Sequence, residues 1–126
     1  MKHQDLEVWN KAIKLVTDIY IITKNYPKDE IYALTSQMRR CAVSIPSNIA
    51  EGCARFSDKE TLKFLSIAMG SISELETQII ISKNIGYIED IDSIISQISS
   101  VKKLILGLVK YLNTKSEQIY VINICA

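Results

Sequence analysis

Apolar side chains return every three or four positions in four long stretches of the chain, a spacing typical of helices that bury one face. These stretches cover residues 5–24, 28–56, 57–86 and about 89–115. We expect each to form one helix. The side chains predicted to be buried are Leu6, Trp9, Ile13, Val16 and Tyr20, with Ala12 and Ile19 beside them; Ile31, Leu34, Met38, Cys41, Ile45, Ile49 and Cys53; Phe64, Ala68, Ser71, Ile72, Leu75, Ile79 and Ser82; and Ile94, Ile98, Val101, Ile105, Leu108 and Leu112.

The expected helix ends carry recognisable signals. Pro27 pushes the residue before it out of the helical region, so the first helix ends just ahead of it. Pro46 lies inside the second apolar row, which continues in register, so we predict one helix kinked at Pro46. Ser57 and Glu60 form a capping box at the start of the third helix. Gly86 supplies the left-handed residue that ends it.

Four such helices with short connections predict an all-α fold, an antiparallel up-and-down four-helix bundle over residues 1–115. Residues 116–126 form a separate C-terminal tail that is unusually apolar. Three alternatives are open for this tail: it packs on the bundle, it docks on a partner subunit, or it frays. We see no internal repeat and no low-complexity segment.

Composition narrows the class of protein. Lys and Arg total 15 against 14 for Asp and Glu, which argues against a strongly basic nucleic-acid module but leaves room for a local basic patch. The three cysteines are odd in number and widely spaced, which favours reduced thiols in the cytoplasm over a disulfide framework. No stretch approaches the roughly 18 apolar residues that span a bilayer, so we expect no membrane association.

The sequence contains no constellation that indicates catalysis. His3 is the single histidine and precedes the first helix. A di-iron bundle needs Glu-x-x-His pairs, a zinc site needs clustered Cys and His, and nucleotide folds need glycine-rich loops; all three patterns are missing from the sequence. We therefore expect a protein that is not an enzyme and that needs no metal or cofactor.

Two polar groups on or near the second helix are the candidate sites. One is a stripe at spacings of three and four, which is either a solvated face with a weak ion pair or a subunit interface or ligand surface. The stripe consists of Gln37, Arg40, Ser44, Ser47, Asn48, Glu51 and Arg55. The other is a basic group able to contact phosphates, although acidic residues lie among its members. The basic group consists of Arg39, Arg40, Arg55, Lys59 and Lys63.

Several motifs together resemble one known family. They are Leu6-x-x-Trp9, Tyr26-Pro27-x-x-Glu30-x-x-x-Leu34-x-x-Gln37-x-x-Arg40, the run Ser44-Ile45-Pro46-Ser47-Asn48-Ile49-Ala50-Glu51-Gly52, and then Arg55, Ser57, Phe64, Ala68-x-Gly70-Ser71 and Glu74-Leu75. Over residues 5–113 the chain is similar to the four-helix-bundle proteins encoded in intervening sequences of 23S ribosomal RNA genes. The matching positions of most interest are Gln37, Arg40, Ser47, Asn48, Glu51, Gly52 and Arg55.

This resemblance implies a four-helix bundle that assembles as a homopentamer. It also links the chain to accessory proteins of diversity-generating retroelements, whose pentamers bind nucleic acid and a reverse transcriptase through basic surfaces. The ribosomal label of the family reflects gene location and implies no contact with the ribosome. The chain departs from the retroelement branch in being nearly neutral.

The leading hypothesis is a non-enzymatic oligomeric bundle that serves as a nucleic-acid-associated or partner-binding scaffold. The alternatives are a structural or protein-docking module without a nucleic-acid role, and a retroelement accessory protein that binds a reverse transcriptase. If the stripe is an interface, reversing the charge of Arg40 or Glu51 should disrupt assembly more than it unfolds the protomer.

Overall fold

The computed structural model describes residues 2–125, and the side chains of residues 2–115. It contains four long helices: α1 (Glu7–Thr23), α2 (Leu34–Cys53), α3 (Asp58–Asn84) and α4 (Asp92–Cys125). Two short 3-10 helices, η1 (His3–Asp5) and η2 (Lys28–Glu30), precede α1 and α2. Within the described part of the chain there is no strand. The prediction of an all-α fold is confirmed.

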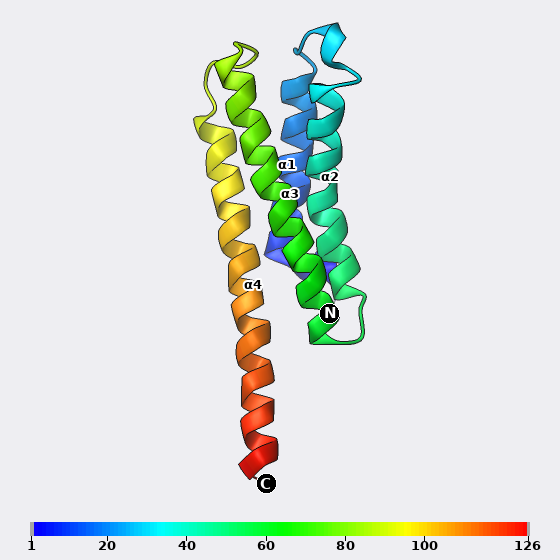
Figure 1. The fold of residues 1–126 in the computed structure, drawn as a ribbon, viewed down its shortest axis with the longest axis vertical. Helices are drawn as coiled ribbons and strands as arrows, with labels where there is room; N and C mark the ends of the chain where they lie inside the picture. Colours follow the sequence, from blue (N-terminus) through cyan, green and yellow to red (C-terminus); the bar gives the residue numbers. More distant parts are fainter. Residues whose placement is uncertain (1, 126) are drawn as a thin grey trace.

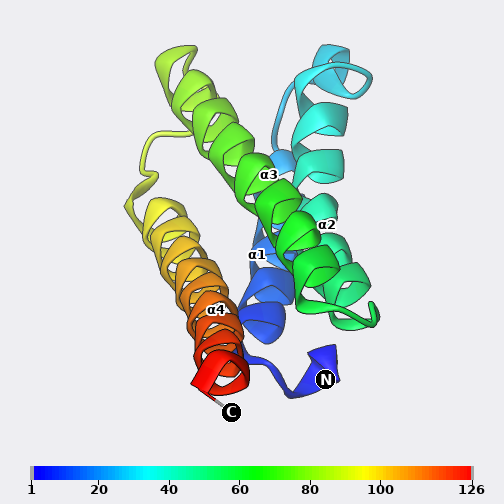
Figure 2. The ribbon, with the colours of Figure 1, turned by 60° about the horizontal axis from the view of Figure 1, so that its bottom comes forward.

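The four helices lie side by side as a bundle, with their connections at alternating ends (Figure 1). Each helix contacts two neighbours, in the order α1, α2, α3, α4 and back to α1, and the α2–α3 contact is the most extensive. Figure 2 shows the bundle tilted forward, with α4 set beside α1 and α3. This arrangement places α2 and α3 together on one side and confirms the predicted four-helix bundle.

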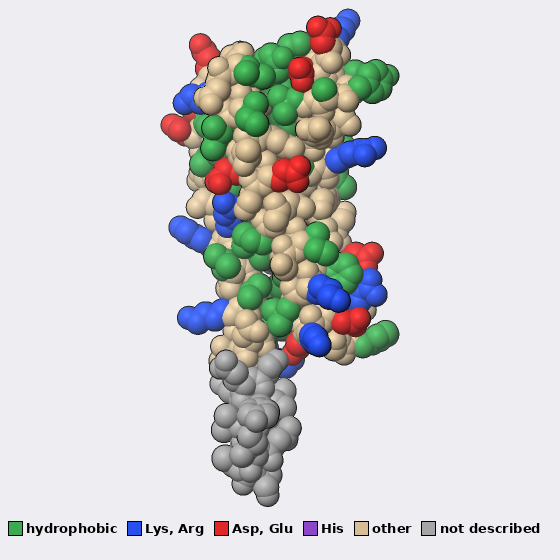
Figure 3. Space-filling view, in the orientation of Figure 1, with side chains coloured by type: hydrophobic (Ala, Val, Ile, Leu, Met, Phe, Trp, Pro, Cys, Tyr) green, Lys and Arg blue, Asp and Glu red, His purple; other side chains and the backbone are tan. Residues whose placement is uncertain are grey.

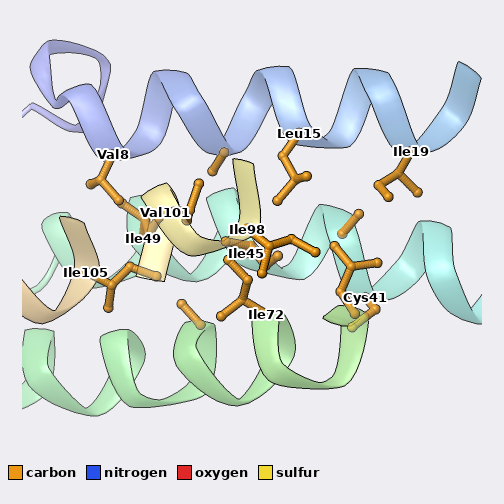
Figure 4. Close-up of a cluster of buried hydrophobic side chains, with 14 of the residues drawn as sticks. Val8, Leu15, Ile19, Cys41, Ile45, Ile49, Ile72, Ile98, Val101 and Ile105 are labelled. Atoms are coloured by element: carbon orange, nitrogen blue, oxygen red, sulfur yellow. The ribbon is translucent and has the colours of Figure 1, made fainter. Parts of the chain in front are cut away.

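The core follows the predicted rows in α2, α3 and α4. Met38, Ile45 and Ile49 of α2 and Ile72 and Leu75 of α3 are completely buried. In α4 every member of the predicted row is buried except Leu108, which packs against the core and is partly exposed. Figure 4 shows Ile45, Ile72 and Ile98, from three different helices, converging in this core. At the start of the second row the prediction was wrong, because Ile31 lies in the turn before α2 and is exposed.

The face of α1 that is buried differs from the predicted one. Val8, Ala12, Leu15, Ile19 and Thr23 enter the core. Ala12 and Ile19, which were expected beside the predicted row, are buried as predicted. Of the row itself, Ile13 and Tyr20 are exposed, and Leu6, Trp9 and Val16 are only partly buried. The reason is that α1 is apolar on two adjacent sides, and periodicity alone does not tell which of the two faces the other helices.

The predicted helix ends are confirmed at α3. The Ser57 hydroxyl accepts a hydrogen bond from the Glu60 backbone N–H at 3.2 Å. At the other end Gly86 has a φ of 87°, and the Tyr87 N–H donates to the Ser82 carbonyl while the Gly86 N–H donates to that of Lys83. This pair of bonds is the Schellman arrangement that a left-handed residue permits. Helix α2 continues through Pro46; the kink there stays a prediction.

Two expectations concern segments at the margins of the bundle. α4 runs to Cys125, but the side chains of the apolar tail, residues 116–126, lie outside the described ones, so the alternatives for its packing stay open.

α3 is long and apolar enough, by length and composition, to cross a membrane, so the expectation that no segment is apolar enough was wrong. Its buried row packs in the bundle, and the core helices of soluble proteins pass the same criterion.

Candidate functional site

Part of the polar stripe holds α2 against α3. The Ser44 and Ser71 hydroxyl oxygens lie 2.8 Å apart, across the contact between the two helices. The Asn48 side-chain amide donates to the Ser44 carbonyl at 2.7 Å and to its hydroxyl at 2.9 Å. Ser44 and Asn48 are therefore half-buried and satisfied within the chain. Their role in this structure is to position α2 on α3.

Cys41 belongs to the same contact. Its thiol donates to the Ser71 carbonyl at 2.9 Å, and burial, aided by the nearby Glu74 carboxylate, raises the pKa of the thiol to about 12. Burial also raises the pKa of the half-buried Cys53 thiol. A nucleophilic cysteine needs a lowered pKa, so neither environment activates the sulfur. Cys41 is the small core residue that its register predicts.

The outer part of the stripe is exposed: Gln37, Arg40, Ser47, Glu51 and Arg55 all face solvent. The predicted pair forms, with the Arg55 guanidinium 3.0 Å from the Glu51 carboxylate. Arg55 also lies over the Phe64 ring, 4.6 Å from its centre. An exposed pair of this kind contributes a few tenths of a kcal/mol. Arg40, in contrast, has no ion-pair partner among the side chains described.

The five residues of the basic group lie in two separate parts of the bundle. Arg39 and Arg40 lie near the start of α2, whereas Arg55 lies about 20 Å further along, since a helix rises about 1.5 Å per residue. Lys59 and Lys63 are close to Arg55 in sequence, in the first turns of α3. Arg39 lies over the Tyr20 ring at 4.7 Å, and its Nε donates to the Thr23 hydroxyl at 2.9 Å. Arg39 therefore joins α1 to α2.

Phe56 lies between Arg55 and the lysines, in the connection from α2 to α3, and is fully exposed. Charged side chains of both signs surround this end of the two helices (Figure 3). The sequence signal for this surface was a single aromatic residue among basic ones. The sequence alone does not predict that the Phe56 ring is exposed rather than packed in the core.

A groove on the outer side of α1 and α2 is the feature that sequence reasoning missed. It has a volume of about 500 Å³. Its lining consists of Tyr20, Ile31, Ser36, Arg39, Arg40, Val43 and Ser44. Tyr20 is 40% exposed, and Ile13, two turns earlier on the same side of α1, is 39% exposed. Tyr20, which was expected in the core, thus lines an open groove that also carries Arg40.

No group of three or more His, Cys, Asp and Glu side chains that could hold a metal occurs in the part of the chain described. His3 packs edge-to-face on Trp9, with ring centres 5.1 Å apart, at the beginning of the chain. Its ring therefore helps to fix the segment before α1.

Comparison with known proteins gives one result. Residues 4–107 match the family model described as 23S rRNA-intervening sequence protein, which covers α1, α2, α3 and the first half of α4. No curated protein matches the chain.

Proposed function

The chain belongs to the family of 23S rRNA-intervening sequence proteins, and on this basis we propose that it is a non-catalytic scaffold that assembles from several copies of itself. The observation that carries the proposal is the second apolar side of α1. Ile13 and Tyr20 are about 40% exposed, and Tyr20 lines the groove together with Val43 of α2 and Ile31 of the preceding turn. Apolar side chains gathered in one groove favour burial against another protein surface.

The chemistry of the described side chains supports a non-catalytic role. Cys41 is protonated at neutral pH because burial raises its pKa to about 12, so it is a poor nucleophile. His3, the single histidine in the sequence, packs on Trp9 away from the groove that carries Arg40. The proposed action is therefore binding. The resemblance suggests five copies, and the odd number and wide spacing of the cysteines suggest a cytoplasmic location; both are part of the proposal.

Self-assembly predicts a measurable mass. Light scattering on the purified chain should give a mass several times that of the 14.2 kDa protomer, and about 71 kDa for five copies. Replacing Ile13 and Tyr20 together by serine should lower this mass, because it removes apolar surface that assembly buries. The matched control replaces Ile80 and Leu106 by serine; these residues are 46% and 57% exposed elsewhere on the bundle, and their replacement should leave the mass unchanged. A mass of one protomer at all concentrations would contradict the proposal.

Nucleic-acid binding at the Phe56 end is the second candidate. A free aromatic ring beside Arg55, Lys59 and Lys63 is the combination with which single-stranded nucleic acids are bound, by stacking and phosphate contact. Glu51 engages Arg55, and Asp58 and Glu60 lie nearby, so we expect weak binding that depends on low salt.

A titration with single-stranded RNA tests this candidate. Replacing Lys59 and Lys63 by glutamine should weaken binding. It should also make the fall of log affinity with log salt less steep by about 1.4, because two phosphate contacts are lost. Phe56→Ala should weaken binding without changing the slope. Lys110→Gln, at an exposed lysine of α4, is the control. If RNA does not bind even near 50 mM salt, a protein-docking role without nucleic acid, including docking to a reverse transcriptase, becomes the better proposal.

A further inference from the structure

We propose that the α1–α2 groove of one copy receives the outer face of α3 of a second copy, so that Arg40 of the groove meets Glu74 of the neighbouring α3. This inference rests on the proposed self-assembly and specifies its contact. The partner is a second copy because this chain itself carries a surface that complements the groove in charge, in apolar residues and in height along the bundle.

The charges complement each other. Arg40 and Glu74 are both exposed, and neither has an ion-pair partner within 4 Å among the described side chains. Arg40 lines the groove. Glu74 is exposed at the edge of the outer face of α3 that borders α2, where its carboxylate helps to raise the pKa of the Cys41 thiol. An unpaired cation in a groove and an unpaired anion on a helix face favour contact in one orientation.

Apolar side chains flank both charges. On α3, Ile67 and Ile81 lie seven residues on either side of Glu74, so the three share one face two turns apart. Ile67 is 48% exposed and Ile81 is 44% exposed. On the other surface, Ile31 lines the groove that carries Arg40, and Ile13 is exposed on α1 two turns before Tyr20, which also lines the groove. Each surface therefore has the order apolar, charged, apolar along the bundle.

The two charges also lie at the same height. Ser44 of α2 meets Ser71 of α3 at 2.8 Å, which fixes the level of the two helices relative to each other. The bond from Thr61 to the Gly52 carbonyl, at 2.8 Å, shows that positions rise along α3 as they fall along α2. Arg40 is four residues before Ser44 and Glu74 is three after Ser71. At about 1.5 Å per residue their levels differ by about 1.5 Å.

The apolar flanks match in the same way. The bond from Arg39 to Thr23 sets the level of α1 against α2. Ile13 lies ten residues before Thr23, so it is level with residue 49 of α2. Ile67 lies four residues before Ser71 and is level with residue 48. The flanking isoleucines Ile31 and Ile81 both lie toward the end of the bundle where α1 connects to α2.

In a ring whose axis is parallel to the helices, two groups that meet between copies must lie at the same height along the bundle. Rotation about an axis parallel to the helices moves each copy sideways without raising it, so contacting groups must start at the same level. The groove lies between α1 and α2, and the Glu74 face lies on α3, beside α2. Because these surfaces are on neighbouring rather than opposite sides of the bundle, each contact turns the next copy relative to the last, as a closed ring requires.

Charge reversal tests the contact. Arg40→Glu and Glu74→Arg should each weaken self-association by about tenfold or more, because like charges then face each other. Combining both substitutions in one chain should restore the wild-type mass. Mixing the two single variants in equal amounts should raise the mass above that of either variant alone, since alternating copies pair opposite charges at every contact but one of a five-membered ring. Lys110→Glu, at an exposed site on α4, controls for a change in net charge.

The outcomes separate the two proposals. If the wild-type chain is a monomer, the proposed function fails and this inference fails with it. If the wild type assembles and both single variants assemble equally well, self-association stands and the Arg40–Glu74 contact is wrong. If the double variant regains mass but the mixture has no larger mass than either single variant alone, the two residues interact within one chain, and the contact between copies is wrong. Thermal melting of each variant checks that the protomer stays folded.

Discussion

Replacing Ile45 by alanine should lower the free energy of unfolding by about 2–5 kcal/mol, the range for removing a large aliphatic side chain from a packed core. Ile45 is completely buried in the middle of α2, where side chains of the other helices surround it (Figure 4). The loss combines the transfer of three carbon atoms to water with the cavity left behind. Urea unfolding followed by circular dichroism measures it.

The control for this experiment is Ile80→Ala. Ile80 lies on α3 and is 46% exposed, so its truncation should cost much less than that of Ile45. Both proteins should be unfolded at one protein concentration, because self-association adds to apparent stability. Equal losses for Ile45→Ala and Ile80→Ala would show that the buried position of Ile45 is wrong.

Gly52→Leu should destabilise the protein by about 1–3 kcal/mol or more, because α2 and α3 approach closely at this residue. A Cβ atom at Gly52 would lie 3.2 Å from the Phe64 Cβ and 3.3 Å from the Thr61 carbonyl oxygen. The Thr61 hydroxyl also donates to the Gly52 carbonyl at 2.8 Å, in a buried position. A leucine would push the helices apart and break this bond. Thermal denaturation measures the effect.

Gly107→Leu is the matched control, since an added Cβ at Gly107 of α4 has no atom within 4 Å. Leucine favours a helix over glycine by somewhat less than 1 kcal/mol, so this variant should be as stable as the wild type or slightly more stable. A Gly52→Leu protein with unchanged melting temperature would mean that α3 does not pack against α2 at this point.

Sequence periodicity predicts three of the four buried faces because α2, α3 and α4 each have one clearly apolar row. On α1 it is right for Ile19 but wrong for Ile13 and Tyr20, because the helix has two adjacent apolar sides and only the one with Leu15 and Ile19 is buried. The choice between two apolar sides depends on which helices lie next to α1, and local spacing carries no information about that.

In the candidate site, contacts within one helix could be predicted from the sequence, whereas contacts between helices could not. The Glu51–Arg55 pair follows from a spacing of four residues within one helix. The inward role of Ser44 was not predictable, because it depends on Ser71, which lies 27 residues away and belongs to α3. The groove beside Arg40 was missed for the same reason, since it exists only once α1 is set against α2.

The buried Cys41 thiol between α2 and α3 provides a chemical measure of how often these two helices separate. Cys41 is 7% exposed, and its pKa of about 12 leaves very little thiolate at neutral pH. An alkylating reagent can therefore reach it only while the two helices are transiently separated. The rate at which the reagent modifies Cys41, relative to its rate at the more accessible Cys53, therefore measures how often α2 and α3 separate under native conditions.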